Sequence, residues 1–422
     1  MPPRTLFKSL AAAAFALAAA VFPTATLLAQ NPQASQRAHA GSDPYAKKGD
    51  ANPARTAGYV RYGPFPFGHE HTSTDVEALL GTEPLIWIET EHFRLGCALA
   101  ETELSGSEPW RKEWRKRVMG ELRALHEVLP LVPLKPRRLD PWLRAHLYAH
   151  RLEAIYAEAR TTLGVAQDWF PNERGDRHEG KVYRGDGPHF GMAEKFTVLL
   201  LQRASSHARY THAYHGSEMA EPLRVHDQDY GNLYWGASEE TGGGLFGNDL
   251  ALHSQLVFNI AHNIYSGYRA HSAFLPAWLI TGLSHHHARR ISKRYPTFDR
   301  RDDSDTEERS PFWAWEERVS GLARHEVFVP LDDFFEVTHA GEYTIEQHMH
   351  CWALVEWLLK THRQETVRWL HELSEPLPFR GLPSTAQILR WQRTHFVLAF
   401  DLDIADVDQK FRADVGKKRH RY

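Results

Sequence analysis

The chain contains almost no cysteine: Cys97 and Cys351 are the only two among its 422 residues. A disulfide-rich scaffold is thereby excluded. The two thiols can pair in only one way. A chain of this length can bury a core without a covalent cross-link, so we expect two buried free cysteines.

Excess charge of one sign is also missing. Lysine and arginine total 50 against 53 aspartate and glutamate residues, which gives a formal net charge of -3. This balance produces no overall field that favours nucleic acid or an anionic membrane surface. We therefore expect no nucleic-acid partner, and we interpret the short basic end KKRHRY as a solvated terminus.

Beyond residue 29 the sequence has no apolar run long enough to span a bilayer. The uncharged, alanine-rich run from Ser9 to Ala29 follows Arg4 and Lys8, which is the layout of a secretory signal peptide. An uncleaved membrane anchor is the alternative, but alanine is weakly apolar and Pro23 suits a cleavage region better. We predict a signal peptide at residues 1–29, no transmembrane span after its removal, and export to a periplasmic, cell-surface or secreted location.

Nucleotide and nucleophile motifs are missing as well. The segment GGGLFG at 242–247 lacks the lysine and the following serine or threonine of a phosphate-binding loop, and no Gly-x-Ser-x-Gly occurs. The residue that the chain does have in excess is histidine, with 27 copies. Because imidazole is both a metal ligand and an acid–base group near neutral pH, this excess keeps metal chemistry open.

The order of strand-like and helix-like patterns predicts an α+β fold. Residues 30–58 are polar and rich in Ala, Gly, Asn and Pro, so we interpret them as a disordered linker. Strand patterns follow within 84–99, 195–203 and 232–238, and helical periodicity covers 108–128 and 138–163. Further helices begin near Leu250 and Pro276 and cover 343–361, 363–374 and 384–396. We expect an α+β subdomain at 59–295 and a helical subdomain at 296–422.

Three segments carry a family resemblance: LVFNIAHNIY (256–265), LPAWLITGLSHHH (275–287) and YTIEQHMHCWALVEWLL (343–359). Together they resemble the gluzincins, the peptidase MA-like metallopeptidases of the zincin fold. In that family a His-Glu-x-x-His helix is followed by a helix that supplies a third zinc ligand. The resemblance implies a zincin-like N-terminal part, with a small mixed sheet and the motif helices, followed by a mainly helical C-terminal part.

The chemistry of such a motif depends on helical spacing. Two histidines one turn apart share an ion, the glutamate takes a proton from bound water, and a third ligand closes the site. In the register that fits the spacing best, His262 is the second histidine, and Phe258 and Asn259 stand where the first histidine and the glutamate belong. The third-ligand position is then Thr281, 19 residues after His262.

In the other register His262 is the first histidine, Asn263 replaces the glutamate and Ser266 replaces the second histidine. Only His262 survives as a ligand in either register, and an asparagine stands where the base belongs. An amide cannot accept a proton at neutral pH, which removes general-base help worth about 10²–10⁴-fold in rate. We therefore expect no catalytic residue at Asn259, Asn263 or Thr281, and no standard zinc site.

Other histidines could build a displaced site. His285 lies one helical turn beyond Thr281 on the same face, so His262 and His285, together with His271, are the candidate ligands of a rearranged zinc site. Consecutive helical residues diverge by about 100°, however, so we interpret the run from His285 to His287 as a solvated, cationic helix end. Three other close pairs are interpreted without a metal: His146 and His150 as surface side chains, His69 and His71 as an exposed loop, and His348 and His350 as lying on different helix faces.

The leading hypothesis is an exported, catalytically inactive gluzincin-like protein. It keeps the cleft between its two halves for a peptide or protein ligand and holds no cofactor. One alternative is a metal-dependent hydrolase, a peptidase that binds zinc through the rearranged histidines. A second alternative is a structural envelope or surface protein.

Overall fold

The computed structural model describes residues 43–81, 83–106, 109–173, 183–227, 230–271, 275–295, 297, 314–337, 341, 343–375 and 383–417. The predicted signal peptide and the first part of the predicted linker lie outside the described residues. From Asp43 onward the segment predicted as linker packs on the fold. Asp43 is buried and accepts a 2.6 Å hydrogen bond from the hydroxyl of Tyr62, and helix α1 (Pro53–Thr56) follows.

A six-stranded mixed sheet occupies the N-terminal part, with strands in the order β1-β4-β5-β8-β10-β9. The pairings β5–β8 and β8–β10 are parallel, and the others are antiparallel. The strands are β1 (Arg61–Tyr62), β4 (Ile86–Glu89), β5 (Phe93–Cys97), β8 (Phe196–Leu201), β9 (Leu223–Asp227) and β10 (Asn232–Ser238). Two small two-stranded antiparallel sheets accompany the large one: the hairpin of β2 (Pro66–Gly68) with β3 (His71–Thr72), and the pair of β6 (Thr102–Glu103) with β7 (Arg138–Leu139).

Both faces of the sheet are buried. Because neighbouring strand residues point to opposite faces, Val198 and Leu200 join the main core, whereas Leu199 and Leu201 join a second, smaller core. A strand that is covered on both faces has a continuous apolar sequence, and this pattern predicted a strand at 195–203. The structure confirms it as β8.

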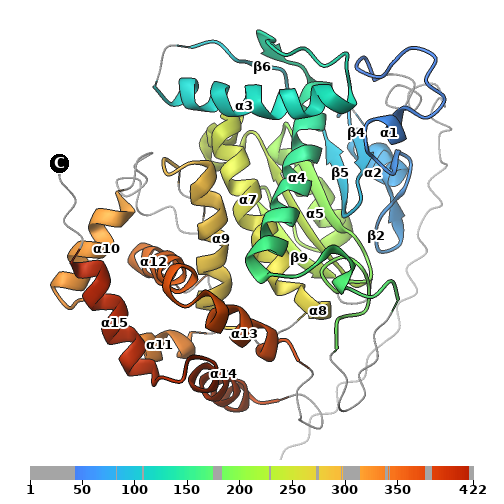
Figure 1. The fold of residues 1–422 in the computed structure, drawn as a ribbon. Coiled ribbons are helices and arrows are strands. Elements are labelled where there is room, and N and C mark those ends of the chain that lie inside the picture. The colour runs from blue at the N-terminus through green and yellow to red at the C-terminus, as the bar shows by residue number, and fades with distance from the viewer. Residues whose placement is uncertain are drawn as a thin grey trace, which may run out of the picture.

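Helices cover both faces of the sheet, and Figure 1 shows α4 and α7 running along it. Apolar residues of α4 and α7 belong to the main core, and those of α2 and α5 belong to the smaller one. The helices of this part are α2 (Ser73–Leu80), α3 (Pro109–Val128), α4 (Pro141–Leu163), α5 (Ala204–His215), α6 (Thr241–Gly244), α7 (Asp249–Ser266), α8 (Tyr268–His271) and α9 (Ala277–Ile291).

The C-terminal part is helical wherever it has regular structure among the described residues. It consists of α10 (Trp315–Arg324), α11 (Leu331–Glu336), α12 (Ile345–Thr361), α13 (Arg363–Leu373), α14 (Thr385–Phe400) and α15 (Ile404–Gly416). Its apolar residues continue the main core, which includes Ala54 near the start of the described chain and Val415 near its end. The predicted α+β class, with a small mixed sheet before a helical part, is confirmed.

Close packing of α12 on α9 depends on one glycine (Figure 1). A Cβ atom placed on Gly282 of α9 would lie 2.4 Å from the carbonyl oxygen of Cys351 and 2.4 Å from Cγ2 of Val355, both on α12. These distances are far inside normal contact, so the two backbones approach more closely there than a side chain would allow.

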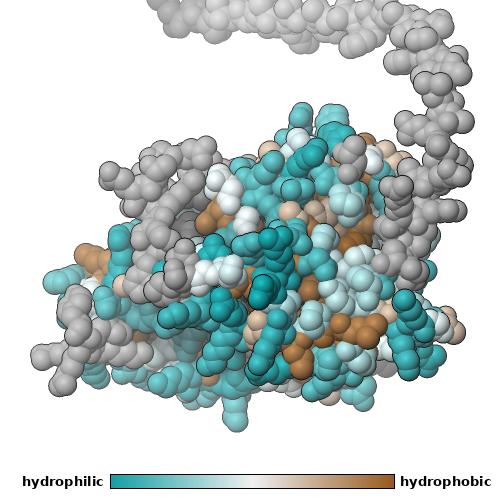
Figure 2. Space-filling model, turned by 90° about the horizontal axis from the view of Figure 1, so that it is seen from above, coloured by the Kyte–Doolittle hydropathy of each residue, from teal (hydrophilic) through white to brown (hydrophobic). Residues whose placement is uncertain are grey.

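The described part of the chain contains no helix that is both long enough and apolar enough to cross a bilayer. Figure 2 shows a face on which hydrophilic residues predominate and hydrophobic residues are scattered in small groups. The two cysteines, Cys97 on β5 and Cys351 on α12, are buried and free, as predicted.

Candidate functional site

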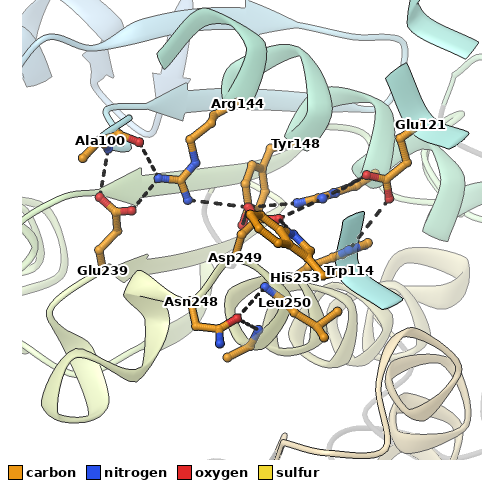
Figure 3. Close-up of polar contacts among 12 residues, drawn as sticks. Ala100, Trp114, Glu121, Arg144, Tyr148, Glu239, Asn248, Asp249, Leu250 and His253 are labelled. Carbon is orange, nitrogen blue, oxygen red and sulfur yellow. Dashed lines mark hydrogen bonds and ion pairs between the residues drawn. The ribbon is translucent and has the colours of Figure 1, made fainter. Parts of the chain in front are cut away.

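The helix that carries the degenerate motif, α7, is fixed at its first turn by a buried polar network (Figure 3). Asn248 caps the helix: its side-chain oxygen accepts hydrogen bonds from the backbone N–H groups of Leu250 and Ala251. Three glycines at 242–244 precede it, with φ between 65° and 85°, so the turn into the cap uses backbone conformations that glycine tolerates best.

Asp249, the first residue of α7, is the centre of that network. Its carboxylate accepts hydrogen bonds from Trp114 Nε1 (2.8 Å), Tyr148 Oη (2.9 Å) and both terminal nitrogens of Arg151 (3.2 and 3.0 Å). Burial alone would raise the pKa of Asp249, but the guanidinium groups of Arg151 and Arg144 outweigh it and hold the pKa well below its ordinary value. Side chains of α3 and α4 supply the hydrogen bonds to this carboxylate, so we assign the network a structural role, which is to hold α7 on α3 and α4.

Phe258 and Asn259, which stand where the first histidine and the glutamate of the motif would be, both lie next to the guanidinium of Arg224. The amide oxygen of Asn259 accepts a hydrogen bond from Arg224 of the edge strand β9, and its Nδ2 donates to the carbonyl of Gln255 at 2.9 Å. The same guanidinium lies 6.0 Å from the ring centre of Phe258. A fixed positive charge beside these positions repels a divalent cation, so Arg224 adds to the loss of donor atoms.

His262 is the one motif position that still carries an imidazole. It is partly buried, and its Nδ1 lies 3.3 Å from the hydroxyl of Ser266 on the next turn. Burial lowers the pKa of His262 well below its ordinary value, and the charge of Arg224 adds to the shift. In the second register the residue at the base position is Asn263, and its Nδ2 donates to the carbonyl of Tyr234 at 3.2 Å, toward the sheet.

The histidine run on α9 is not a solvated helix end, and that interpretation is wrong. His285 and His287 are fully buried, because α12 covers His285 and α4 covers His287. The sequence of α9 alone does not show that these two helices pack against it. His285 Nε2 lies 3.0 Å from Nδ1 of His348, and its Nδ1 lies 3.2 Å from the hydroxyl of Thr297. Burial lowers the pKa of His285 well below its ordinary value, with the neighbouring His348 adding to the shift.

Thr281 lies one turn before His285 and is completely buried. Its hydroxyl oxygen has no hydrogen-bond partner among the described residues. The ring of His285 lies 4.6 Å from that of Phe258, and His262 is among the groups that lower the pKa of His285. Neither Thr281 nor Phe258 supplies a nitrogen lone pair, so these residues do not fit the ligand set of a zinc ion.

Within the described ranges, no group of three or more His, Cys, Asp or Glu side chains is placed to hold a metal ion. The side chain of His271, the third candidate for a rearranged site, lies outside the described residues. His348 approaches His285, whereas His350 stacks on Phe328, so these two histidines occupy different helix faces as predicted.

Two other interpretations of histidine pairs are corrected. His146 is not a surface residue: it is fully buried, with Nδ1 2.8 Å from the hydroxyl of Tyr59 and Nε2 3.4 Å from Asp43. His71 is not in an exposed loop, because it forms part of β3 and its ring stacks on Tyr214 at 3.8 Å. In both places the covering segment is distant in sequence, which local pattern cannot show.

A cavity of about 950 Å³ lies where the end of α9 meets the helical C-terminal part. Its wall comes from the end of α9 and from α10, α12 and α15, with Glu113 of α3. None of the degenerate motif positions, nor His262 or His285, belongs to that wall.

The charge of this cavity is uneven. Glu316 pairs with Arg289 (3.2 Å) and Lys293, and Glu356 with His286 (2.7 Å). By contrast, Arg290, Arg294 and Lys360 have no ion pair among the described residues. The guanidinium of Arg289 is also held between the rings of Trp315 and Trp352, at 4.2 and 4.5 Å from their centres.

Comparisons of the chain with family models, with curated proteins and with solved structures find no match.

Proposed function

We propose that this chain is an exported, non-catalytic relative of the gluzincin metallopeptidases that binds an acidic peptide or protein segment in the cavity where the end of α9 meets the helical C-terminal part. The fold class that the resemblance implies, a small mixed sheet with the motif helices before a helical part, supports the relationship. The absence of peptidase chemistry and the choice of ligand rest on separate observations.

The observation that carries the non-catalytic part is the environment of Asn259. Its amide is committed to Arg224 and to the backbone of Gln255, so the position offers neither a base nor a metal ligand. Losing even a partner that orients a metal ligand costs about 10–100-fold in affinity or activity, and here the direct ligands themselves are replaced. Hydrolysis through the standard machinery is therefore not expected.

The choice of ligand follows from the cavity. Its volume of about 950 Å³ is at the upper end of the range for ligand sites, which suits several residues of an extended chain. Three cationic side chains that form no ion pair within the described part of the chain, Arg290, Arg294 and Lys360, remain available for carboxylates of the ligand. The side chains of Trp352 and Trp357, which also line the wall, supply apolar contact area.

The test is fluorescence anisotropy with a labelled, end-capped hexaglutamate peptide and a hexalysine peptide of the same length. The hexaglutamate peptide is expected to bind, and the double substitution Arg294→Glu with Lys360→Glu is expected to weaken it by at least about tenfold, as two lost charge-assisted contacts would. Arg123→Glu, on the exposed face of α3 away from the cavity, is the matched control and should leave binding unchanged.

If the two peptides bind equally well, or if the double substitution does not change binding, the proposal that the cavity binds an acidic segment is wrong. The non-catalytic part is tested on the same preparation by metal analysis and a casein digestion assay. Stoichiometric zinc that disappears in His262→Ala, or casein turnover that a chelator stops, would favour the rearranged hydrolase instead.

A further inference from the structure

A second cavity, of about 240 Å³, lies at the other side of the sheet and shares no residue with the degenerate motif or with the large cavity. The hairpin of β2 and β3 closes one side, and α5 with the strands β8, β9 and β10 closes the other. It faces the smaller core, because Thr197 and Tyr234 project from the sheet on that side.

Aromatic side chains line the cavity, and contacts with one another hold their rings in place. The ring of His71 stacks on Tyr214 at 3.8 Å, and its Nδ1 donates to the carbonyl of His69 at 2.9 Å because a carbonyl can only accept. The other nitrogen of His71 is then the acceptor for the hydroxyl of Tyr210, 3.2 Å away. Tyr210 in turn stacks on Tyr234, with ring centres 5.3 Å apart.

The charges of the wall are of one sign. Glu70 and Asp227 line the cavity, and no lysine or arginine occurs among the described residues of the wall. Asp227 accepts one hydrogen bond, from the backbone N–H of Tyr230 at 3.0 Å. Burial lowers the pKa of His71 and lowers that of His215 to about 4, so these two imidazoles do not offset the carboxylates at neutral pH, whereas the third imidazole of the wall, His69, lies 3.8 Å from Glu70.

One polar atom of the wall is unsatisfied. Nε2 of His215 is buried and has no hydrogen-bond partner in the described part of the chain, while its ring lies 4.7 Å from that of Tyr234. A buried nitrogen without a partner is uncommon in folded proteins, and a ligand could pair with this one only after the ring of His215 moves.

The geometry points to a binding site for a small organic amine, whose ammonium group lies toward Asp227 and Glu70 and whose apolar body packs on the tyrosine rings. A cation is attracted both by the carboxylates and by the faces of aromatic rings. The volume lies just below the usual range for drug-sized ligands, so the amine is compact. The ring faces favour a body that itself contains a ring over a linear chain.

Isothermal titration of the purified protein with three matched probes tests this assignment. They are 2-phenylethylamine, the uncharged 2-phenylethanol, and phenylalanine, which adds a carboxylate to the same amine. The amine is expected to bind at least about tenfold more tightly than either of the others, since the carboxylates of the wall repel the added negative charge. Equal affinity for the amine and the alcohol would overturn the site.

Substitutions locate the binding. Asp227→Asn keeps the oxygen that accepts from Tyr230 and removes the charge, so it should weaken 2-phenylethylamine by about tenfold or more without changing the affinity for 2-phenylethanol. Asp333→Asn, exposed on α11, is the control and should change nothing. If both substitutions act alike, the amine binds elsewhere.

A second pair of substitutions tests the ring contact. Tyr214→Phe keeps the ring face and should bind the amine as the parent does, whereas Tyr214→Leu should bind it several-fold more weakly. N-acetyl-lysine amide carries the same ammonium group on a linear chain. If that compound binds more tightly than 2-phenylethylamine, the ligand of the cavity is a lysine side chain of a protein, and the proposal of a small free amine is wrong.

Discussion

His350 is a buried histidine on α12 that has no hydrogen-bond partner for either ring nitrogen among the described residues. Its ring packs against both Phe328 and Phe411, with ring centres 4.1 and 5.3 Å away. Burial lowers its pKa to about 3, and the charge of Arg412 adds to the shift. The folded state therefore binds fewer protons at this residue than the unfolded state between about pH 3 and pH 6.5.

His350→Phe keeps an aromatic ring at this position and removes the titration. Stability that depends on a neutral histidine is present above pH 6.5 and is lost as the pH falls below it. Relative to the parent protein, the free energy of unfolding of the variant should therefore rise by about 2 kcal/mol between pH 7.5 and pH 5, whatever its value at pH 7.5. Urea denaturation at the two pH values measures this difference.

His212→Phe, on the exposed side of α5, is the control for a change of histidine to phenylalanine without burial. A gain at pH 5 of the same size in His212→Phe, or no gain in His350→Phe, would contradict the assignment of the effect to burial.

The residue scale is also where sequence reasoning went furthest wrong. Spacing placed His285 on one helix face correctly, but it could not show that His348, 63 residues further along, covers that face. The same holds for His146, which is buried against Tyr59 from a segment 87 residues away. Residue type and helical period determine which side chains share a face. The element that covers the face is set by tertiary packing.

Gly282 controls the contact between two elements. A methyl group on this residue of α9 would press against the backbone of Cys351 and the side chain of Val355. Gly282→Ala is therefore expected to lower the free energy of unfolding by about 1–3 kcal/mol, because α12 must shift to make room and the packing around it loosens. Denaturant titration followed by circular dichroism measures the change.

Gly120→Ala provides the opposite expectation in the same assay. Gly120 lies in α3, it is exposed, and a Cβ atom there meets no other atom within 4 Å. Alanine is the better helix former, so this variant should gain about 0.5–1 kcal/mol. A gain in both variants would mean that α9 and α12 do not pack as closely as described.

At the level of elements the sequence was informative where the periodic pattern was long. The helices expected at 108–128, 138–163 and 343–361 are present, since many turns of regular apolar spacing leave little ambiguity. The short edge strand β9 was not foreseen: its sequence LRVHD alternates apolar and polar residues over only five positions, and all five are half-buried. That strand supplies Arg224, so the feature that most changes the motif region was also the least visible.

The main core extends through the whole molecule without a break between the sheet and the C-terminal helices. It includes strand residues such as Val198, motif-helix residues such as Leu256, and Phe411 on α15. Elements that share one core are expected to lose it together. Differential scanning calorimetry should therefore show one transition, with a ratio of calorimetric to van't Hoff enthalpy near about 1.

Separate melting of the sheet-containing part and the helical part would contradict this expectation. Far-ultraviolet circular dichroism and tryptophan fluorescence, recorded on the same sample, should give one melting midpoint. Trp235 reports from the sheet and Trp369 from the C-terminal helices, so the fluorescence signal samples both parts.

Two buried thiols give the molecule built-in chemical reporters. Burial raises the pKa of Cys97 to about 12 and raises that of Cys351 well above its ordinary value, so neither sulfur reacts as a thiolate while the region around it is folded. One sulfur sits in the sheet and the other in α12. Alkylation by iodoacetamide, resolved by peptide mass, would therefore time the opening of each region separately without any engineered label.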